Sequence, residues 1–214
     1  MVLSRLSLVG VFVGNLLGFF SNIKKRFKSV GTPHFQIDED TELYLLEEQH
    51  AEALFVLTDQ NRQYLREWLP WLDNNMSLED TEDFVRDSLE QFRNNNGFQL
   101  GLWYEGRLAG VIGYHRIDRA NRATSIGYWL GASFQGKGLM TRACRTLIDY
   151  AFNDLRLNRV EIRCAAKNAK SRAIPLRLGF KEEGVIRQSE WLYDHYVDHV
   201  VYGMVKNEWQ NSRK

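Results

Sequence analysis

The sequence predicts a single α/β domain with an antiparallel sheet at its centre, and three observations support this. The 214 residues are 44% hydrophobic, which is enough for one sizeable core. Three β-like runs separated by turn residues, 98–104, 108–117 and 123–130, indicate an antiparallel meander. The segment from Leu139 to Leu155 then repeats apolar residues about every four positions, as an amphipathic helix does.

The segments before the meander alternate between strand-like and helix-like patterns. Leu43 to Leu46 is expected to be a strand and Ala51 to Thr58 a helix. Tyr64 to Leu72 has helical spacing that its proline closes or kinks. Ser77 to Asp80 matches a capping box, which predicts a further helix that ends at an Asn-Asn-Asn-Gly run.

The segments after the amphipathic helix predict the rest of the sheet. Arg159 to Ala165 is expected to be a buried strand and Ser171 to Leu178 a short helix. Glu182 to Leu192 and His199 to Val205 are the last expected strands. Exposed late strands would allow pairing at the sheet edge, so a homodimer is a possible assembly.

Charge and cysteine usage exclude several classes of protein. The net charge of +1 gives no strong attraction to nucleic acid or to anionic lipid. Cys144 and Cys164 match neither a C-x-x-C pair nor a zinc ligand set, so both are expected to be buried thiols in a reducing, cytoplasmic compartment. His115, His195 and His199 have no partner at a ligand spacing, so no metal is expected.

Residues 1–33 differ in composition from the remainder. An apolar run from Leu6 to Phe20 precedes a basic cluster at residues 24–28. The run is short for a spanning helix and has no small-residue cleavage site. A weak membrane-surface segment, a disordered leader and a misplaced start remain as alternatives, and attachment to a membrane is not expected. The boundary at Pro33 leaves residues 34–214 as the catalytic domain.

The most informative junction joins the third meander strand to the amphipathic helix. Its sequence is Gln135-Gly136-Lys137-Gly138-Leu139-Met140-Thr141. A helix start has unpaired N–H donors, and glycines let an anion approach the backbone, which suits a pyrophosphate. An ordinary left-handed turn is the alternative. The spacing matches neither a P-loop nor a dinucleotide fingerprint.

This junction resembles the acetyl-CoA signature of the GCN5-related N-acetyltransferases (GNAT), Gln/Arg-x-x-Gly-x-Gly/Ala, except that Met140 replaces a small residue. Further motifs resemble the branch that acetylates ribosomal proteins (RimJ/RimL-like) and extend from about Glu42 to Trp209. These motifs are Asn61-Arg62, Leu65, Trp68-Leu69-Pro70-Trp71, Ile126-Gly127-Tyr128-Trp129, Asn158-Arg159-Val160, Asn168-x-x-Ser171 and Leu178-Gly179-Phe180-x-x-Glu183-Gly184.

The resemblance implies a GNAT fold, with a mixed, mostly antiparallel, twisted sheet flanked by helices. The strand that ends at Leu130 would splay from the strand Val160 to Ala165, and the pantetheine arm of acetyl-CoA would lie in the gap. Backbone groups near Trp129 and Leu130 would polarise the thioester. The N–H groups from Gly136 through Lys137, Gly138, Leu139 and Met140 to Thr141 would hold the pyrophosphate, after Gln135. Asn168 would contact the pantetheine from the other wall, and Lys137 would either add charge or remain a solvated surface lysine.

The resemblance also implies catalytic roles. Many family members have a tyrosine acid where this chain has Pro175. Ser171 would therefore donate to the departing thiolate, unless it only caps its helix. Glu190 would act as the base, unless it is a solvent-facing strand carboxylate. Trp68 and Trp71 would form one wall of the acceptor cleft.

The expected function is direct transfer of an acetyl group from acetyl-CoA to a primary amine. The favoured acceptor is the N-terminal α-amine of a ribosomal protein, and a small amine such as a polyamine or an aminoglycoside is the alternative. An acidic lining from Asp73, Glu79, Asp80 and Asp83 would favour the polycation. Pro175 and Met140 leave open a non-catalytic CoA-binding module.

Overall fold

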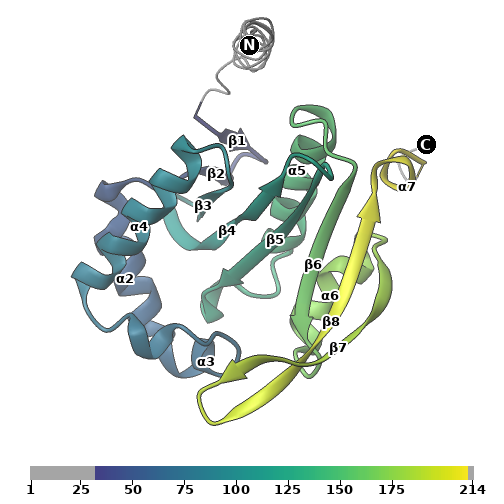
Figure 1. Ribbon diagram of the computed structural model, residues 1–214. Helices are drawn as coiled ribbons and strands as arrows, with labels where there is room; N and C mark the ends of the chain where they lie inside the picture. The colour runs from purple at the N-terminus through teal and green to yellow at the C-terminus, as the bar shows by residue number, and fades with distance from the viewer. Residues whose placement is uncertain (1–31, 212–214) are drawn as a thin grey trace, which may run out of the picture. The chain divides into compact units, whose positions relative to one another are not determined.

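The computed structural model describes residues 32–211, which form one mixed sheet flanked by helices (Figure 1). The sheet order is β1-β2-β3-β4-β5-β6-β8-β7. Every neighbouring pair of these strands is antiparallel except β5 and β6. The strands are β1 His34–Gln36, β2 Thr41–Leu45, β3 Phe98–Tyr104, β4 Arg107–Asp118, β5 Ala123–Leu130, β6 Arg159–Ala165, β7 Lys181–Leu192 and β8 His195–Val205. The expected fold class is confirmed.

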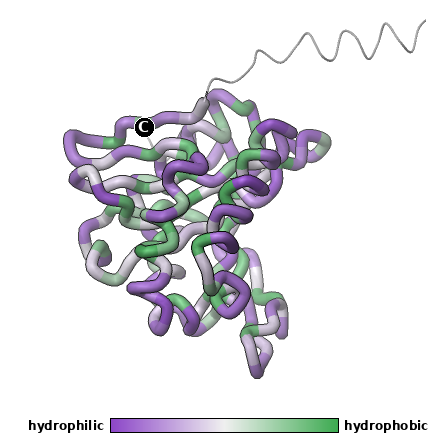
Figure 2. Tube along the Cα trace, turned by 90° about the vertical axis from the view of Figure 1, so that its left-hand side faces the viewer, coloured by the Kyte–Doolittle hydropathy of each residue, from purple (hydrophilic) through white to green (hydrophobic). Residues whose placement is uncertain are grey.

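The helices divide between the two faces of the sheet. Their bounds are η1 Glu48–His50, α2 Ala51–Gln60, α3 Arg62–Arg66, η2 Leu72–Asn74, α4 Leu78–Arg93, η3 Ala132–Phe134, α5 Leu139–Asn153, α6 Ala169–Arg177 and α7 Lys206–Asn211. In Figure 1, α5 and α6 lie behind the strands, whereas α2 to α4 lie on the other side. Hydrophobic stretches lie mostly inside, and the peripheral loops are hydrophilic (Figure 2).

Local sequence signals determine where the two longest helices begin. Ser77 Oγ accepts from the Asp80 N–H at 3.2 Å, and the Asp80 carboxylate accepts from the Ser77 N–H at 2.8 Å. This is the expected capping box of α4. Helix α5 begins after Gly138, whose left-handed φ of 72° a glycine adopts without steric cost. The apolar stripe of α5 is buried in the core.

The structure differs from the sequence prediction mainly around Pro70. The single helix expected over 64–72 is instead the short α3, a turn and η2. Proline disfavours helical backbone at the residue before it, so the helix cannot continue. Arg62 stabilises the new path, donating to the carbonyls of Leu72 at 2.7 Å and Asn75 at 2.9 Å.

The other differences lie at the ends of the domain. Strand β8 begins at His195, four residues before the expected start at His199, because a two-residue turn joins it to Leu192. The short elements β1 and α7 have too few residues to show a periodic pattern. No helix within residues 32–211 is long and apolar enough to cross a membrane. The predictions for residues 1–31 lie outside the described residues.

Candidate active site

The centre of the site is the gap between β5 and β6. The two strands pair only from Ala123 to Ser125, against Arg159 to Glu161. Beyond these residues the strands separate, as Figure 1 shows. Residues 126–130 still pair with β4 on their other side. Since backbone groups alternate along a strand, half of those in this stretch face the gap and are available to a ligand. The splay implied by the resemblance is therefore present.

The loop from β5 to α5 lies at the end of this gap. Gly136 and Gly138 have φ values of 77° and 72°, and no atom lies within 4 Å of a Cβ built on Gly136. The first backbone bond of α5 runs from the Arg142 N–H to the Gly138 carbonyl. The N–H groups of the preceding turn are therefore not used by the helix and are available to an anion.

The side chains of this loop leave its backbone accessible. Met140, which departs from the family signature, is only 4% exposed and packs in the core. Its side chain is thus directed away from the anion. Gln135 accepts a bond from Lys170 at 3.0 Å, and Thr141 accepts one from Arg177 at 2.7 Å. The Lys137 ammonium lies 4.6 Å from the ring centre of Tyr104. These cations give the loop a local positive charge within a chain of nearly balanced charge.

Asn168 and Ser171 lie on the α6 wall of the gap. The Asn168 side chain accepts from the Ser171 N–H at 3.0 Å, so Asn168 is the N-cap of α6 and Ser171 is not. The Ser171 hydroxyl lies 3.2 Å from Cys164 Sγ and 3.4 Å from the Tyr128 hydroxyl. Tyr128 donates in turn to the Ser171 carbonyl at 3.1 Å. One cluster thus joins β5, β6 and α6 where the strands part.

Burial keeps the groups of this cluster protonated. It raises the pKa of the Tyr128 phenol well above its ordinary value and also raises the pKa of the Cys164 thiol. Cys144 is likewise buried with a raised pKa, and both cysteines are free, as expected. The cluster therefore holds neutral donors on the α5 and α6 side of the gap.

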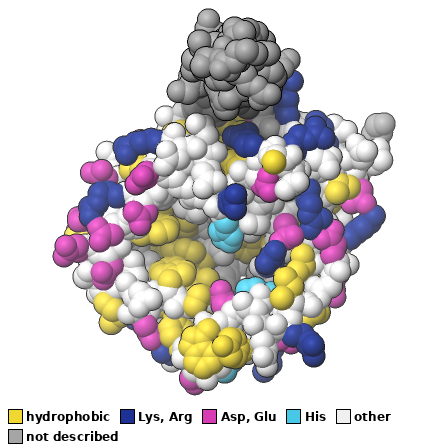
Figure 3. Space-filling view, in the orientation of Figure 1, with side chains coloured by type: hydrophobic (Ala, Val, Ile, Leu, Met, Phe, Trp, Pro, Cys, Tyr) yellow, Lys and Arg dark blue, Asp and Glu magenta, His cyan; other side chains and the backbone are white. Residues whose placement is uncertain are grey.

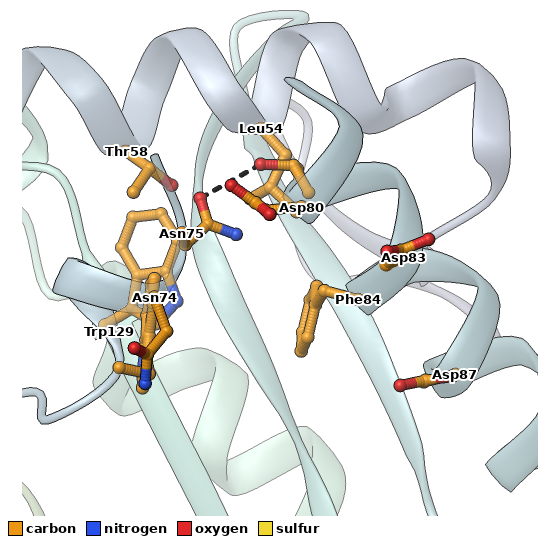
Figure 4. Close-up of a pocket in the computed structure, with 11 residues that line it drawn as sticks. Leu54, Thr58, Asn74, Asn75, Asp80, Asp83, Phe84, Asp87 and Trp129 are labelled. Carbon is orange, nitrogen blue, oxygen red and sulfur yellow. Dashed lines mark hydrogen bonds between the residues drawn. The ribbon is translucent and has the colours of Figure 1, made fainter. Parts of the chain in front are cut away.

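A cavity of about 470 Å³ opens on the opposite face of the sheet, at the end of β5 (Figure 4). Trp71 and Trp129 line it, with their ring centres 6.3 Å apart. Trp68, which was expected beside Trp71, is not among the lining residues. Phe84 projects from α4 into the cavity. The cavity meets the gap at Trp129, the penultimate residue of β5.

Two residues that were not assigned a role hold the cavity walls. Asn61 accepts from the Ala132 N–H at 2.8 Å and donates to the Leu57 carbonyl at 2.8 Å, which ties α2 to the loop after β5. Arg62 holds the loop that contains Asn75. The Asn61-Arg62 pair is recognisable in the sequence as a motif, but only the three-dimensional contacts show that it holds the cavity walls in place.

The acidic lining is smaller than the sequence suggested. Asp80, Asp83 and Asp87 line the cavity, whereas Asp73 and Glu79 do not. Asp80 is occupied by the capping box, and its pKa is lowered by the bonds from Ser77 and Met76. Asp83 forms an ion pair with Arg86. Asp73 is bound in two bonds by Arg66. One carboxylate, that of Asp87, thus remains for a positively charged acceptor.

Glu190 lies on β7, where its Oε2 is 3.4 Å from His199 Nε2. The Glu190 side chain is 30% exposed, so it is not simply a solvent-facing carboxylate. His115 of β4 rests on Gly127, where an added Cβ would lie 2.1 Å from its Nε2. Burial lowers the pKa of His115, the charge of Arg163 lowers it further, and the charge of Glu190 opposes both.

These groups share one face of the sheet. Along β8, Tyr202 bonds Arg172 of α6, so His199, an odd number of residues away, is directed to the opposite face. Histidine side chains are visible in the hollow at the middle of this face (Figure 3). No group of three or more His, Cys, Asp or Glu side chains in residues 32–211 is arranged to hold a metal ion.

With the exception of Trp68, the expected site residues lie along the gap or on the faces beside it. The loop 135–141, Trp129, Leu130 and the Asn168–Ser171 turn lie along the gap, Trp71 is in the adjoining cavity, and Glu190 is on the same face as that cavity. Sequence reasoning assigned no role to Tyr128, His115 or His199. Their partners are 43, 12 and 9 residues away in the chain, so no local spacing reveals them.

Comparisons with known proteins agree with this geometry. A family described as "Acetyltransferase (GNAT) domain" matches residues 41–181. The chain is 42% identical over 179 residues to the putative ribosomal N-acetyltransferase YdaF of Bacillus subtilis, covering 83% of this chain and 98% of that protein. It is 32% identical over 174 residues to the ribosomal-protein-serine acetyltransferase of Escherichia coli, covering 81% and 97%.

A solved structure is similar as well. RimL, a ribosomal L7/L12 α-N-protein acetyltransferase in complex with coenzyme A, matches with a TM-score of 0.79 and 28% identity, covering 82% of this chain and 99% of that one. The match to the family spans well over half of the chain and includes β5, the glycine loop and α6. The chain therefore belongs to the GNAT family of acetyltransferases.

Proposed function

We propose that this enzyme transfers the acetyl group of acetyl-CoA directly to the N-terminal α-amine of a ribosomal protein. The observation that carries the proposal is the meeting of two different spaces at Trp129. Trp129 belongs to the part of β5 that is not paired with β6, and its side chain also lines the aromatic cavity. A thioester in the gap would thus meet an amine in the cavity. The related enzymes that acetylate ribosomal proteins support this acceptor.

The donor would lie along the gap. Its pyrophosphate would bind the N–H groups after Gly136, with Lys137, Lys170 and Arg177 close by. Its pantetheine arm would extend between β5 and β6, with Asn168 on one wall. Backbone groups of Trp129 and Leu130 would polarise the thioester carbonyl. These positions agree with the open backbone edge of β5 beyond Ser125.

The chemistry needs no covalent enzyme intermediate. The unprotonated amine attacks the carbonyl carbon, the C–S bond breaks, and the coenzyme A thiolate takes a proton. Ser171 is proposed to donate a hydrogen bond to the departing thiolate, because its hydroxyl lies among neutral donors in the gap, and the proton itself comes from water. Glu190 is proposed to drive removal of the proton from the amine nitrogen, on the opposite face.

The cavity suits a peptide better than a polyamine. A polycation needs several free carboxylates at once, and two of the three aspartates in the lining already have partners. An N-terminal ammonium requires only one free carboxylate, and Asp87 provides it. The aromatic walls from Trp71, Phe84 and Trp129 give apolar contact for the first side chains of a peptide.

The test is release of coenzyme A thiol from acetyl-CoA with a panel of acceptors. We expect release with peptides that copy the N-termini of ribosomal proteins. The matched control is each peptide with a blocked N-terminus and its lysines unchanged, which should give none. Release from the blocked peptides, or from a polyamine or an aminoglycoside alone, would contradict the proposed acceptor. Acetyl-CoA binding without release for any acceptor would indicate a CoA-binding module.

Residues 34–214 are proposed to be the catalytic domain, acting in the cytoplasm where ribosomal proteins are made. Deleting residues 1–33 should then leave both acetyl transfer and soluble partitioning unchanged. We also propose that β7, an edge strand with Val185, Ile186 and Trp191 exposed, pairs with a second copy of the chain. The solution mass, measured by light scattering, tests this: a monomer at micromolar concentration would exclude it.

A further inference from the structure

Strand β7 is irregular immediately before Glu190. Ile186 pairs with His199 and Glu190 pairs with Val197, so β7 advances four residues while β8 advances two. The extra residues form a bulge in which Gln188 has a φ of 49° and donates its N–H to Asp198 Oδ1 at 2.8 Å. Bulges of this kind re-aim side chains and occur often beside active sites.

The turn of the β7–β8 hairpin determines what Glu190 can reach. Leu192 pairs with His195, Trp191 with Tyr196 and Glu190 with Val197, so this register runs unbroken from the turn. His199, two residues beyond Val197, is therefore the diagonal neighbour of Glu190 on the same face. Diagonal pairs are within reach of long side chains. The bulge then shifts only the residues of β7 that precede Glu190.

The pair is located beside the gap. His199 lies opposite Ala165, at the end of β6 that has parted from β5. Its side chain is 16% exposed and belongs to the face that carries the cavity. The charged and titratable groups around the pair are His115 of β4, Arg163 of β6 and Asp198 of β8, and the charges of Arg163 and Glu190 both act on His115.

Glu190 and His199 are in contact as an ion pair, and a small approach of the two side chains would make them a hydrogen-bonded carboxylate–imidazole pair. If Nε2 carries its hydrogen toward Glu190 Oε2, the lone pair of Nδ1 is free to accept a proton. Glu190 then holds the ring in that tautomer and stabilises the imidazolium that forms. The 3.4 Å separation lies at the outer limit of a hydrogen bond, as is common before substrate binds.

We propose that His199 receives the proton that leaves the acceptor amine, with Glu190 as the carboxylate that orients it. This rests on the proposed acetyl transfer and specifies its base. The ammonium of the acceptor gives its proton to Nδ1 of His199, and the free amine attacks the thioester. The imidazolium then releases the proton to water, so the pair returns to its starting state.

The experiment is the pH dependence of kcat/KM for acetyl transfer in three variants of the full chain. His199→Gln keeps a donor toward Glu190 but cannot accept a proton at neutral pH. We expect its rate to fall about 100-fold and the acidic limb of the profile to follow the protonation of the acceptor amine alone. His195→Gln, on the same strand and with an exposed side chain, is the matched control and should behave as wild type.

Glu190→Gln separates this proposal from direct action of the carboxylate. If His199 is the base, Glu190→Gln keeps an acidic limb that differs from that of the acceptor amine, because the imidazole still takes the proton. If Glu190 is itself the base, the limb of Glu190→Gln follows the amine alone, which would overturn the proposal. A wild-type profile for His199→Gln would overturn it too. Measurements of acetyl-CoA binding and of thermal unfolding show whether each variant is folded. If the wild type itself transfers no acetyl group, the proposed function is refuted rather than the role of His199.

Discussion

The two sides of the gap between β5 and β6 present different chemical groups. The donor side consists of backbone: two left-handed glycines, a helix start and an open strand edge, supported by the neutral cluster of Tyr128, Cys164 and Ser171. The side proposed for the acceptor consists of titratable side chains on three separate strands, His115 on β4, Glu190 on β7 and His199 on β8. One side is a fixed surface for an anion, and the other can change its charge.

This difference follows from what each substrate requires. The pyrophosphate of coenzyme A stays anionic at neutral pH, so unpaired N–H groups on a rigid turn recognise it well. The amine arrives as an ammonium ion and must lose a proton, so its side needs groups that can accept one. Variants of the two sides should therefore fail in different ways.

The largest effect is expected from Glu190→Gln on the acceptor side. Removing the carboxylate should lower kcat/KM about 100-fold, mostly below the pKa of the amine, because the proton no longer has a charged partner. Acetyl-CoA affinity, measured by calorimetry, should remain that of wild type. A weakened acetyl-CoA affinity would mean that the two sides are not independent.

A smaller effect is expected from Ser171→Ala on the donor side. Loss of the hydroxyl should lower kcat about tenfold. The effect is smaller than that of Glu190→Gln because a thiolate is a good leaving group and depends less on a donor than the ammonium depends on a base. Tyr128→Phe keeps the ring between the strands and removes only the phenol that contacts Ser171. A rise in KM for the peptide with kcat unchanged would contradict a role in the departure of the thiolate.

The sequence made the donor side predictable because its parts are contiguous. The loop 135–141 is a single run of residues, and its glycines and the apolar residues after them predict both the turn and the start of the helix. The acceptor side depends on contacts between separate strands, which no local spacing reveals. The bulge in β7 is not marked in the sequence either, since Gln188 adopts a positive φ without being glycine. The identity of the N-cap of α6 was also ambiguous, because Asn168 and Ser171 are both good caps.

A third prediction tests the backbone origin of donor binding. Gly138→Ala places a side chain at a φ of 72°, which costs roughly 1–2 kcal/mol. The loop should relax and misdirect its N–H groups, weakening acetyl-CoA binding about tenfold. Gly184→Ala is the control, since Gly184 has a φ of 149° on the edge strand β7 and no atom lies within 4 Å of a Cβ built on it. Equal loss of affinity in both variants would show that general destabilisation is the cause.

The smallest effect concerns the strands that carry the acceptor side. Arg159 joins Glu161 of its own strand to Glu183 of β7, at 2.9 Å and 2.5 Å. The bonds from Arg159 hold the pKa of Glu183 below its usual value. A carboxylate with a lowered pKa in the folded state stabilises the fold above its unfolded pKa of about 4.3, and this contribution disappears as the pH falls through the folded value.

Glu183→Gln should therefore lower the free energy of unfolding at pH 7 by about 1 kcal/mol or less, because the Glu183 side chain is 39% exposed and solvent screens the pair. The difference from wild type should shrink as the pH drops below 4, when denaturant unfolding is compared at each pH. Glu39→Gln, an exposed carboxylate in the turn before β2, is the control. A difference that stays constant down to pH 2 would show that Glu183 acts through packing across Gly203 rather than through its charge.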